Sequence, residues 1–204
     1  EQGLGETLHF IRMAKLLRAR RATTIIHCQA PLLALLQTAE ELGTVFPNNM
    51  PWQQPVDWQC SLLDVADLLR INADRIPDQV PYLRAAPQLK RYWQQRFPRS
   101  PSTFRIGINW QGNPDHQADA YRSLPLACFE RLTTIPNVEL VSLQRDVGTE
   151  QIVGWRGARP LTLLPVDVDL SSGAFMDTAA ILHTLDLVIT SDTAIAHLAG
   201  ALGI

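Results

Sequence analysis

The chain has 204 residues, of which 46% are apolar and 19% are charged, a composition typical of a globular protein with a sizeable core. The net charge of −2 gives no basic excess for nucleic acid, and no apolar run is long enough to span a membrane. The three cysteines are far apart and match neither a disulfide framework nor a zinc motif, so we expect a cytoplasmic protein with reduced thiols.

Strands and helices alternate along the first hundred residues. Apolar residues at helical spacing predict helices, and short β-branched runs predict strands. Ser61, with Asp64 three residues later, is typical of a capping pair at a helix start. The predicted elements are a helix over 6–20, a strand over 23–28, a helix over 31–42, a strand over 44–46 and helices over 62–70 and 87–97.

The stretch PRSPST at 98–103 is the clearest linker, and we place a domain boundary after residue 100. The two predicted domains are therefore 1–100 and 101–204. The elements predicted after the linker are strands over 104–110, 138–143, 161–164 and 186–190, helices from Pro125 and over 148–156, 177–185 and 193–202, and an unstructured polar loop over 111–124. This order predicts an α/β fold with parallel sheets covered on both faces.

Both ends of the sequence have the pattern of interrupted elements. Gly3 and Gly5 resemble a strand-to-helix turn without its strand, and Gly203 with Ile204 resembles a turn into a further strand. We therefore expect a fragment truncated at both ends, with unpaired sheet edges.

Parallel sheets bind ligands at the carboxyl ends of their strands, where helix N-termini attract anions. The stretch GLGET offers such a junction, in which Gly3 and Gly5 permit close approach and Glu6 projects a carboxylate. The alternative is that the glycines only shape a turn and Glu6 complements the helix dipole, and the pattern by itself favours that alternative.

A second junction follows the predicted strand 104–110. Arg122 has the chemistry to clamp a phosphate with two parallel hydrogen bonds. The alternative is a solvated surface loop, although fourteen residues is long for such a connection. The polar residues of this loop that we consider candidates are Asn113, Asp115, His116, Asp119, Arg122 and Ser123.

The stretch SDTAIAHLAG forms a third junction. Asp192 is a natural N-cap, and Thr193 and His197, four residues apart, share one helix face near its positive end. Ala194 is small enough to allow close contact with a ligand. The alternative is a capping aspartate with a buried, hydrogen-bonded histidine. His9, His27 and His183 are isolated in the sequence, and we expect them to have core or surface roles.

Four stretches together resemble one family: EQGLGETLHF, GINWQGNPDHQADAYRSLPL, VSLQ and FMDTAAILHTLDLVITSDTAIAHLAGALGI. The chain resembles the glycosyltransferase module of bacterial tetratricopeptide-repeat proteins, related to the ADP-heptose:lipopolysaccharide heptosyltransferases of glycosyltransferase family nine. The resemblance implies the GT-B arrangement, in which two Rossmann-like domains face each other across a cleft. The acceptor then binds 1–100 and the nucleotide-sugar donor binds 101–204.

The resemblance also implies roles for particular residues. The family's Asp-Thr-(Gly/Ala)-x-x-His motif falls on Asp192, Thr193, Ala194 and His197, which implies contacts to the sugar and diphosphate of the donor. Arg122 matches a phosphate-binding basic residue, and Gln144 follows a strand where the family contacts the nucleotide. Gly5 and Glu6 match the Gly-Asp pair that supplies the catalytic base. Glutamate in place of aspartate is a departure from the family. Gly3, Asn113 and His116 are further candidates for the cleft.

The function implied is inverting, metal-independent transfer of a sugar from a nucleotide-diphosphate donor to an acceptor hydroxyl, with Glu6 as base. No metal or cofactor is expected, and the acceptor is a glycan, a lipid or a protein. Upstream tetratricopeptide repeats are implied by the resemblance alone. Two alternatives stay open: a non-catalytic nucleotide-sugar-binding or scaffold module, and a nucleotide-sugar epimerase.

Overall fold

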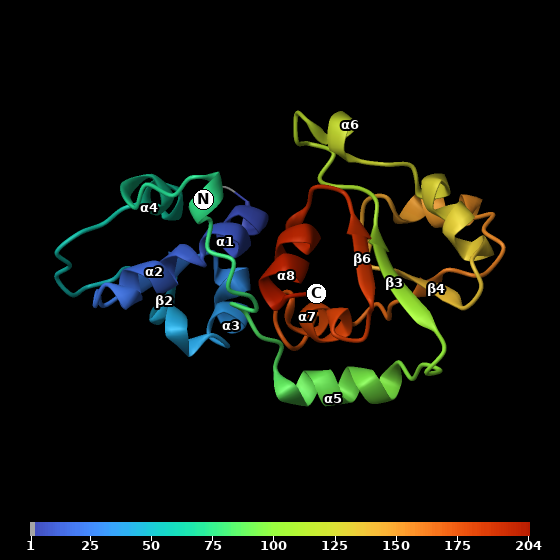
Figure 1. Ribbon diagram of the computed structural model, residues 1–204, viewed down its shortest axis with the longest axis horizontal. Helices are drawn as coiled ribbons and strands as arrows, with labels where there is room; N and C mark the ends of the chain where they lie inside the picture. Colours follow the sequence, from blue (N-terminus) through green and yellow to red (C-terminus); the bar gives the residue numbers. More distant parts are fainter. Residues whose placement is uncertain (1–2) are drawn as a thin grey trace.

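The computed structural model describes residues 3–204; the first two residues of the predicted N-terminal domain lie outside it. The chain forms two sheets whose paired strands are all parallel (Figure 1). Strands β1 (Ile25–Cys28) and β2 (Thr44–Pro47) form the smaller sheet. The larger sheet has the order β5-β4-β3-β6. The predicted α/β class with parallel sheets is confirmed.

The helix predicted over 6–20 is divided into α1 (Leu4–Phe10) and α2 (Met13–Ala19). Arg12 causes the division, because its Nε donates a hydrogen bond of 2.8 Å to the carbonyl oxygen of His9. The next amide groups bond three residues back, from Ala14 to Ile11 and from Lys15 to Arg12. A tighter turn therefore replaces one turn of α-helix at this point.

The helix predicted over 31–42 is likewise interrupted, into the 3₁₀ turns η1 (Ala30–Leu32) and η2 (Glu40–Leu42) around α3 (Leu33–Leu36). The Thr38 hydroxyl donates a hydrogen bond of 2.6 Å to the Leu35 backbone oxygen, and this bond competes with continuation of the helix. Helix α4 (Leu62–Leu68) begins at the predicted capping pair. Ser61 and Asp64 each accept a hydrogen bond from the other's backbone N–H, as expected. A 3₁₀ turn, η3 (Ala73–Arg75), follows.

The second half supplies the larger sheet, from β3 (Phe104–Asn109), β4 (Val138–Ser142), β5 (Thr162–Leu163) and β6 (Leu187–Thr190). Helices α7 (Met176–Leu182) and α8 (Ala194–Leu202) lie close to the predicted ranges. Two predicted helices are instead the 3₁₀ helices η4 (Leu126–Thr134) and η5 (Thr149–Gly154). In η4, Thr133 and Thr134 donate to carbonyl groups three residues back, which favours the tighter helix.

Helix α5 (Pro87–Arg96) precedes the linker but packs against α7 of the second half (Figure 1). Trp93 Nε1 donates a buried hydrogen bond of 2.6 Å to Asp177 Oδ1 at the start of α7. Asp177 in turn accepts a hydrogen bond from the Asp169 backbone N–H. This network fixes α5 against α7.

One apolar cluster extends through both halves of the chain. It contains Leu8 and Ile11 around α1, Leu35 and Leu36 from α3, and the buried residues of α7 and α8. Helix α8 lies between α1 and β6 and joins the two parts of the cluster (Figure 1). A second cluster, which includes Trp110 and Phe129, fills the other face of the larger sheet. Within residues 3–204, no helix has both the length and the apolar character needed to cross a membrane.

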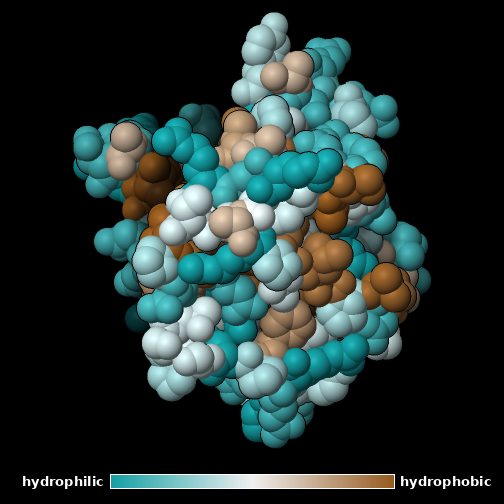
Figure 2. All heavy atoms as spheres, turned by 90° about the vertical axis from the view of Figure 1, so that its right-hand side faces the viewer, coloured by the Kyte–Doolittle hydropathy of each residue, from teal (hydrophilic) through white to brown (hydrophobic). Residues whose placement is uncertain are grey.

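Apolar side chains are also exposed at the outer end of the larger sheet. Figure 2 shows this side of the molecule, where hydrophobic areas are separated by hydrophilic ones. The exposed apolar residues between 147 and 170 are Val147, Val153, Leu163, Val166 and Leu170. Scattered exposure of this kind is common on globular proteins.

Candidate functional site

The carboxyl ends of β3 and β6 lie side by side and hold the start of α8. Asn109 on β3 is opposite Thr190 on β6. The Asn109 side-chain oxygen accepts hydrogen bonds from the hydroxyl groups of Thr190 at 3.2 Å and Thr193 at 3.1 Å. The sheet therefore fixes the position of Thr193 at the carboxyl ends of its strands, where parallel α/β sheets bind ligands.

Helix α8 begins one residue later than the sequence indicates. Its N-cap is Thr193, with extended φ and ψ of −141° and 173°, and not Asp192. In the described part of the chain no side chain caps the helix there, because the Thr193 hydroxyl bonds to the sheet. The Asp192 side chain is 75% exposed. Because the first N–H groups of an α-helix have no partner within the helix, the start of α8 offers donors to an anion.

Ser191 lies between β6 and α8 and was not singled out from the sequence. It is only 4% exposed, and within the described part of the chain its hydroxyl has no hydrogen-bond partner. A buried hydroxyl without a partner is costly and marks a place where a ligand or a water completes the bonding. No sequence signal separates this serine from an ordinary strand-end serine.

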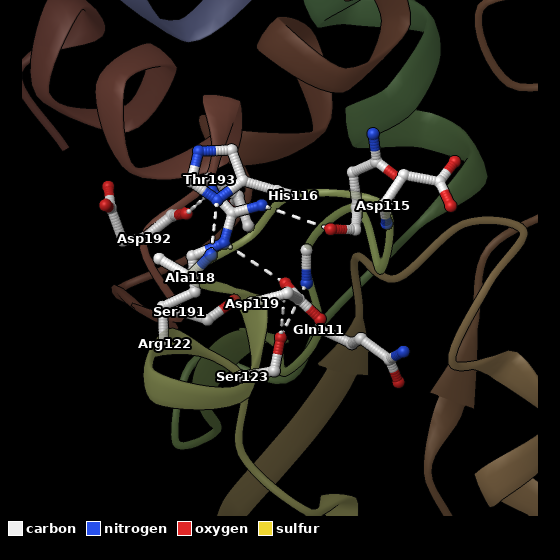
Figure 3. Close-up of polar contacts among 12 residues, drawn as sticks. Gln111, Asp115, His116, Ala118, Asp119, Arg122, Ser123, Ser191, Asp192 and Thr193 are labelled. Carbon is white, nitrogen blue, oxygen red and sulfur yellow. Dashed lines mark hydrogen bonds and ion pairs between the residues drawn. The ribbon is translucent and has the colours of Figure 1, made fainter.

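Arg122, at the end of the loop over 111–124, contacts Asp192, which lies between β6 and α8 (Figure 3). Its Nη1 donates to the Asp192 backbone oxygen at 3.1 Å, and its Nε donates to Asp119 Oδ1 at the same distance. Gly112 permits this arrangement, because a Cβ atom there would lie 2.6 Å from Arg122 Nη2. The structure therefore brings Arg122 and Asp192, which are 70 residues apart, into direct contact.

The loop over 111–124 is more ordered than the sequence predicts and contains the short helix α6 (Asp119–Arg122). The buried Asp119 carboxylate accepts from Arg122 and from the Ser123 hydroxyl at 2.9 Å. Ser123 also accepts from the Gly112 N–H at 3.0 Å. The function of Asp119 as the centre of this network was missed, because a buried acid in a polar stretch has no distinct sequence signal.

Two other loop candidates are less directly involved. The Asn113 backbone oxygen accepts from Arg122 Nη2 at 3.5 Å, while its side chain accepts from the Asp115 N–H within the loop. The exposed His116 uses Nδ1 to accept from the Ala118 N–H at 3.2 Å (Figure 3). Both side chains therefore stabilise the local turn.

Gln144 joins the loops that follow β3 and β4. Its Oε1 accepts from Asn109 Nδ2 and from the backbone N–H groups of Trp110 and Gln111, all within 3.0 Å. Its Nε2 donates to the backbone oxygens of Gln111 and Val147. The side chain is buried, so the structure gives it a positioning role. The direct nucleotide contact stays a prediction.

Gly5 lies inside α1, one residue after the helix begins, and faces α8; it is not the turn before a helix. A Cβ atom at this position would lie 2.8 Å from His197 Cδ2 and 3.4 Å from Ala194 Cα. The absence of a side chain therefore lets α1 approach the first turn of α8 closely. Two predicted site segments, at 3–6 and 192–197, meet through this contact.

Glu6 is exposed and lies in the first turn of α1. Its Oε2 accepts a hydrogen bond of 3.3 Å from the N–H of Gly3, the N-cap residue. This contact at the helix start agrees with the alternative considered above, in which Glu6 only supports the N-terminus of the helix. The base role of Glu6 stays a prediction. A Cβ atom at Gly3 would have no neighbour within 4 Å among residues 3–204.

The sequence indicated an isolated His9, and the structure instead places its ring against His197. Its Nδ1 lies 3.2 Å from Nδ1 of His197, and the two rings meet edge to face. Burial is the main cause that lowers the pKa of His9 from its ordinary value of 6.5, with smaller contributions from Arg12 and His197. His197 Nε2 lies 3.9 Å from Asp192 Oδ1.

Residues 3–204 contain no group of three or more His, Cys, Asp or Glu side chains placed to hold a metal ion.

A hollow of about 450 Å³ lies away from the candidate site, between the segment around Leu83 and helix α5. Its lining includes Arg84, Lys90 and Arg91 together with His183 on the C-terminal side of α7.

Comparison with known proteins supports the fold. No family model matches the chain. Protein FlbA of Caulobacter vibrioides is 24% identical over 222 residues, covering all of this chain, and the chain spans 37% of the length of that relative. The structure of the E. coli ADP-heptose lipopolysaccharide heptosyltransferase II is similar with a TM-score of 0.66 at 14% identity, over 99% of this chain and 80% of that chain. The chain therefore has a heptosyltransferase-like fold.

Proposed function

We propose that the chain is a glycosyltransferase module that moves a sugar from a nucleotide-diphosphate donor to an acceptor hydroxyl. One observation carries the proposal: Arg122, the start of α8 and the Ser191 hydroxyl, which has no partner within residues 3–204, converge at the carboxyl ends of β3 and β6. A guanidinium group and a helix N-terminus together suit a diphosphate. The heptosyltransferase-like fold agrees with this assignment.

The donor contacts in this proposal come from Asp192, Thr193, Ala194 and His197. Arg122 uses Nε, Nη1 and Nη2 once each within the protein, which leaves two of its five N–H groups for a phosphate. The charge that develops on the departing diphosphate is then stabilised by Arg122, His197 and the α8 N-terminus. In the proposed inverting, metal-independent reaction, Glu6 accepts the proton of the acceptor hydroxyl.

The proposal includes the GT-B arrangement, with the acceptor on 1–100 and the donor on 101–204. The acceptor is a glycan, a lipid or a protein, and the reaction takes place in the cytoplasm. We also propose that the chain belongs to a longer protein with tetratricopeptide repeats. The support for a longer protein is that the chain spans 37% of Protein FlbA.

A second candidate is a nucleotide-sugar-binding module without catalysis. The hydrogen bond from the Gly3 N–H to the Glu6 carboxylate favours it, because a base engaged as a helix cap is less available to an acceptor. Both candidates require the same donor site. They differ in turnover, which is measured by release of nucleoside diphosphate with acceptor present.

Isothermal titration of the longest folded form of the protein with ADP, UDP and GDP tests the donor site. We expect one nucleotide to bind saturably. Arg122→Gln should lower the affinity for that nucleotide about tenfold or more, because a hydrogen bond to a charged group contributes about 1.5–3 kcal/mol. Asp192→Ala combined with His197→Ala should abolish binding while circular dichroism shows a folded protein.

Arg145→Gln is the matched control, since within residues 3–204 the hydrogen bonds that Arg145 donates go to the backbone oxygens of Pro165 and Val166. It should bind the nucleotide as the wild type does. Absence of binding for all three nucleotides in the folded protein would refute both the transferase and the binding-module candidates.

A further inference from the structure

The two histidine rings between α1 and α8 constrain each other's protons. A neutral imidazole carries one proton, on either Nδ1 or Nε2. At the observed 3.2 Å, a hydrogen bond between the two Nδ1 atoms requires a proton on one of them and a lone pair on the other. His9 and His197 must therefore adopt opposite tautomers.

Asp192 favours one of the two placements of the shared proton. Its Oδ1 lies 3.9 Å from His197 Nε2, so a carboxylate faces that nitrogen. A lone pair on Nε2 would be repelled, whereas an Nε2–H is attracted. This leaves Nδ1 of His197 without a proton, and Nδ1 of His9 becomes the donor.

The surroundings hold the rings in this arrangement. The imidazole of His197 packs directly against Gly5. A Cβ atom at that position would lie 2.8 Å from His197 Cδ2, so only glycine leaves space for the ring. On the His9 side, the Arg12 Nε donates to the His9 backbone oxygen at 2.8 Å, which fixes the helix end. The guanidinium of Arg12 also favours a neutral His9 ring.

We propose that His9 is a positioning residue for His197: it donates from Nδ1 to Nδ1 of His197 and thereby keeps the Nε2–H of His197 directed toward Asp192 and the start of α8. That start is where the proposed function places an anionic diphosphate, so the ligand part of this inference rests on that function. With its Nε2–H fixed, His197 meets the anion as a hydrogen-bond donor.

Nuclear magnetic resonance of protein with ¹⁵N-labelled histidine tests the arrangement without any ligand. We expect His9 in the Nδ1–H tautomer and His197 in the Nε2–H tautomer at a pH where both are neutral. In His197→Ala, His9 should leave the Nδ1–H form, since its acceptor is gone. A purely structural packing role for His9 would leave its tautomer unchanged in that variant.

Ligand affinity then tests the consequence. His9→Phe keeps an aromatic ring but removes the donor, and we expect it to weaken the bound nucleoside diphosphate about three- to tenfold, the range for one hydrogen bond. His9→Asn restores a donor near the Nδ1 position and should recover most of the affinity. His27→Phe is the control, because His27 is exposed and stacks on Phe46.

The two proposals fail in different ways. Absence of nucleotide binding with the expected tautomers would refute the proposed function and its ligand part, while the positioning of His197 by His9 would stand. An Nε2–H tautomer of His9 in the folded wild type would refute the positioning role, whatever the nucleotide does. Equal affinity of His9→Phe and wild type would also overturn it.

Discussion

Gly5 sets the distance between α1 and α8. An alanine there would place its Cβ 2.8 Å from Cδ2 of the His197 ring. The Nδ1 atom of that ring is in turn 3.2 Å from Nδ1 of His9. Because the ring is held, the strain must be relieved by separating the helices. We expect Gly5→Ala to lower the free energy of unfolding by about 1–3 kcal/mol, as overpacking does, despite the better helix propensity of alanine. Urea denaturation measures the change.

Gly200 in α8 provides the control for this substitution. A Cβ atom at Gly200 would meet nothing within 4 Å, so Gly200→Ala should be neutral or raise the stability by about 0.5–1 kcal/mol. If both alanine variants had the same stability, close packing at Gly5 would not be the reason for its glycine.

The candidate residues differ in how far sequence could place them. Arg122, Asp192 and His197 were recognisable because a basic loop residue and an Asp-Thr-x-x-x-His stretch follow apolar strands. Ser191 and His9 were not recognisable, since their importance depends on burial and on a contact 188 residues away. Periodicity reports the face of an element but not the element that covers it.

A buried hydrogen bond between Trp93 and Asp177 joins α5 to α7. Trp93→Phe retains an aromatic ring but removes the Nε1–H that Asp177 Oδ1 accepts at 2.6 Å. A hydrogen bond to a charged group contributes about 1.5–3 kcal/mol, and we expect a loss of stability in that range. Thermal or urea unfolding monitored by circular dichroism would show it.

Trp58→Phe is the matched control, because Trp58 is 93% exposed. Its effect should remain within about 0.5 kcal/mol, as is usual for surface substitutions. An equal effect of the two substitutions would show that the contact with Asp177 contributes nothing to the attachment of α5.

The type of most elements followed from sequence, whereas their continuity did not. Strands β1 to β6 correspond to apolar or β-branched runs, and α4 begins at its capping pair. The segments 6–20 and 31–42 have helical periodicity throughout. They are nevertheless interrupted, because Arg12 and Thr38 hydrogen-bond to backbone carbonyl groups. Such competition leaves no trace in a hydrophobic pattern.

The contribution of His9 and His183 to the stability of the whole fold should decrease as the pH falls from about 7.5 to 5.5. Burial lowers the pKa of His9 and His183 from the ordinary 6.5, so the unfolded chain binds more protons there. Their contribution is complete well above pH 6.5 and decreases as the pH falls through 6.5 toward the folded values. The slope for each group stays below about 1.4 kcal/mol per pH unit, the limit for one proton.

Denaturation at several pH values, compared between wild type and His9→Phe, isolates the share of His9. The facing groups are Arg12, His197 and, beyond His197, Asp192. The lowered pKa values of Glu41 and Asp186 affect stability only below their ordinary values of 4.5 and 3.8, outside this range. The free energy of unfolding of the wild type, relative to that of His9→Phe, should decrease from pH 7.5 to pH 5.5, and a relative value independent of pH would contradict the assignment.

The apolar cluster shared by both halves makes each half depend on the other for burial. Helices α1 and α5 come from the first hundred residues, yet they cover α8 and α7 of the second half. A gene rearrangement that transferred residues 101–204 alone would expose the apolar surfaces of α7 and α8 that α5 and α1 cover. Evolutionary shuffling is therefore expected to move the two halves together, and to leave their shared seam as the most slowly diverging part of the chain.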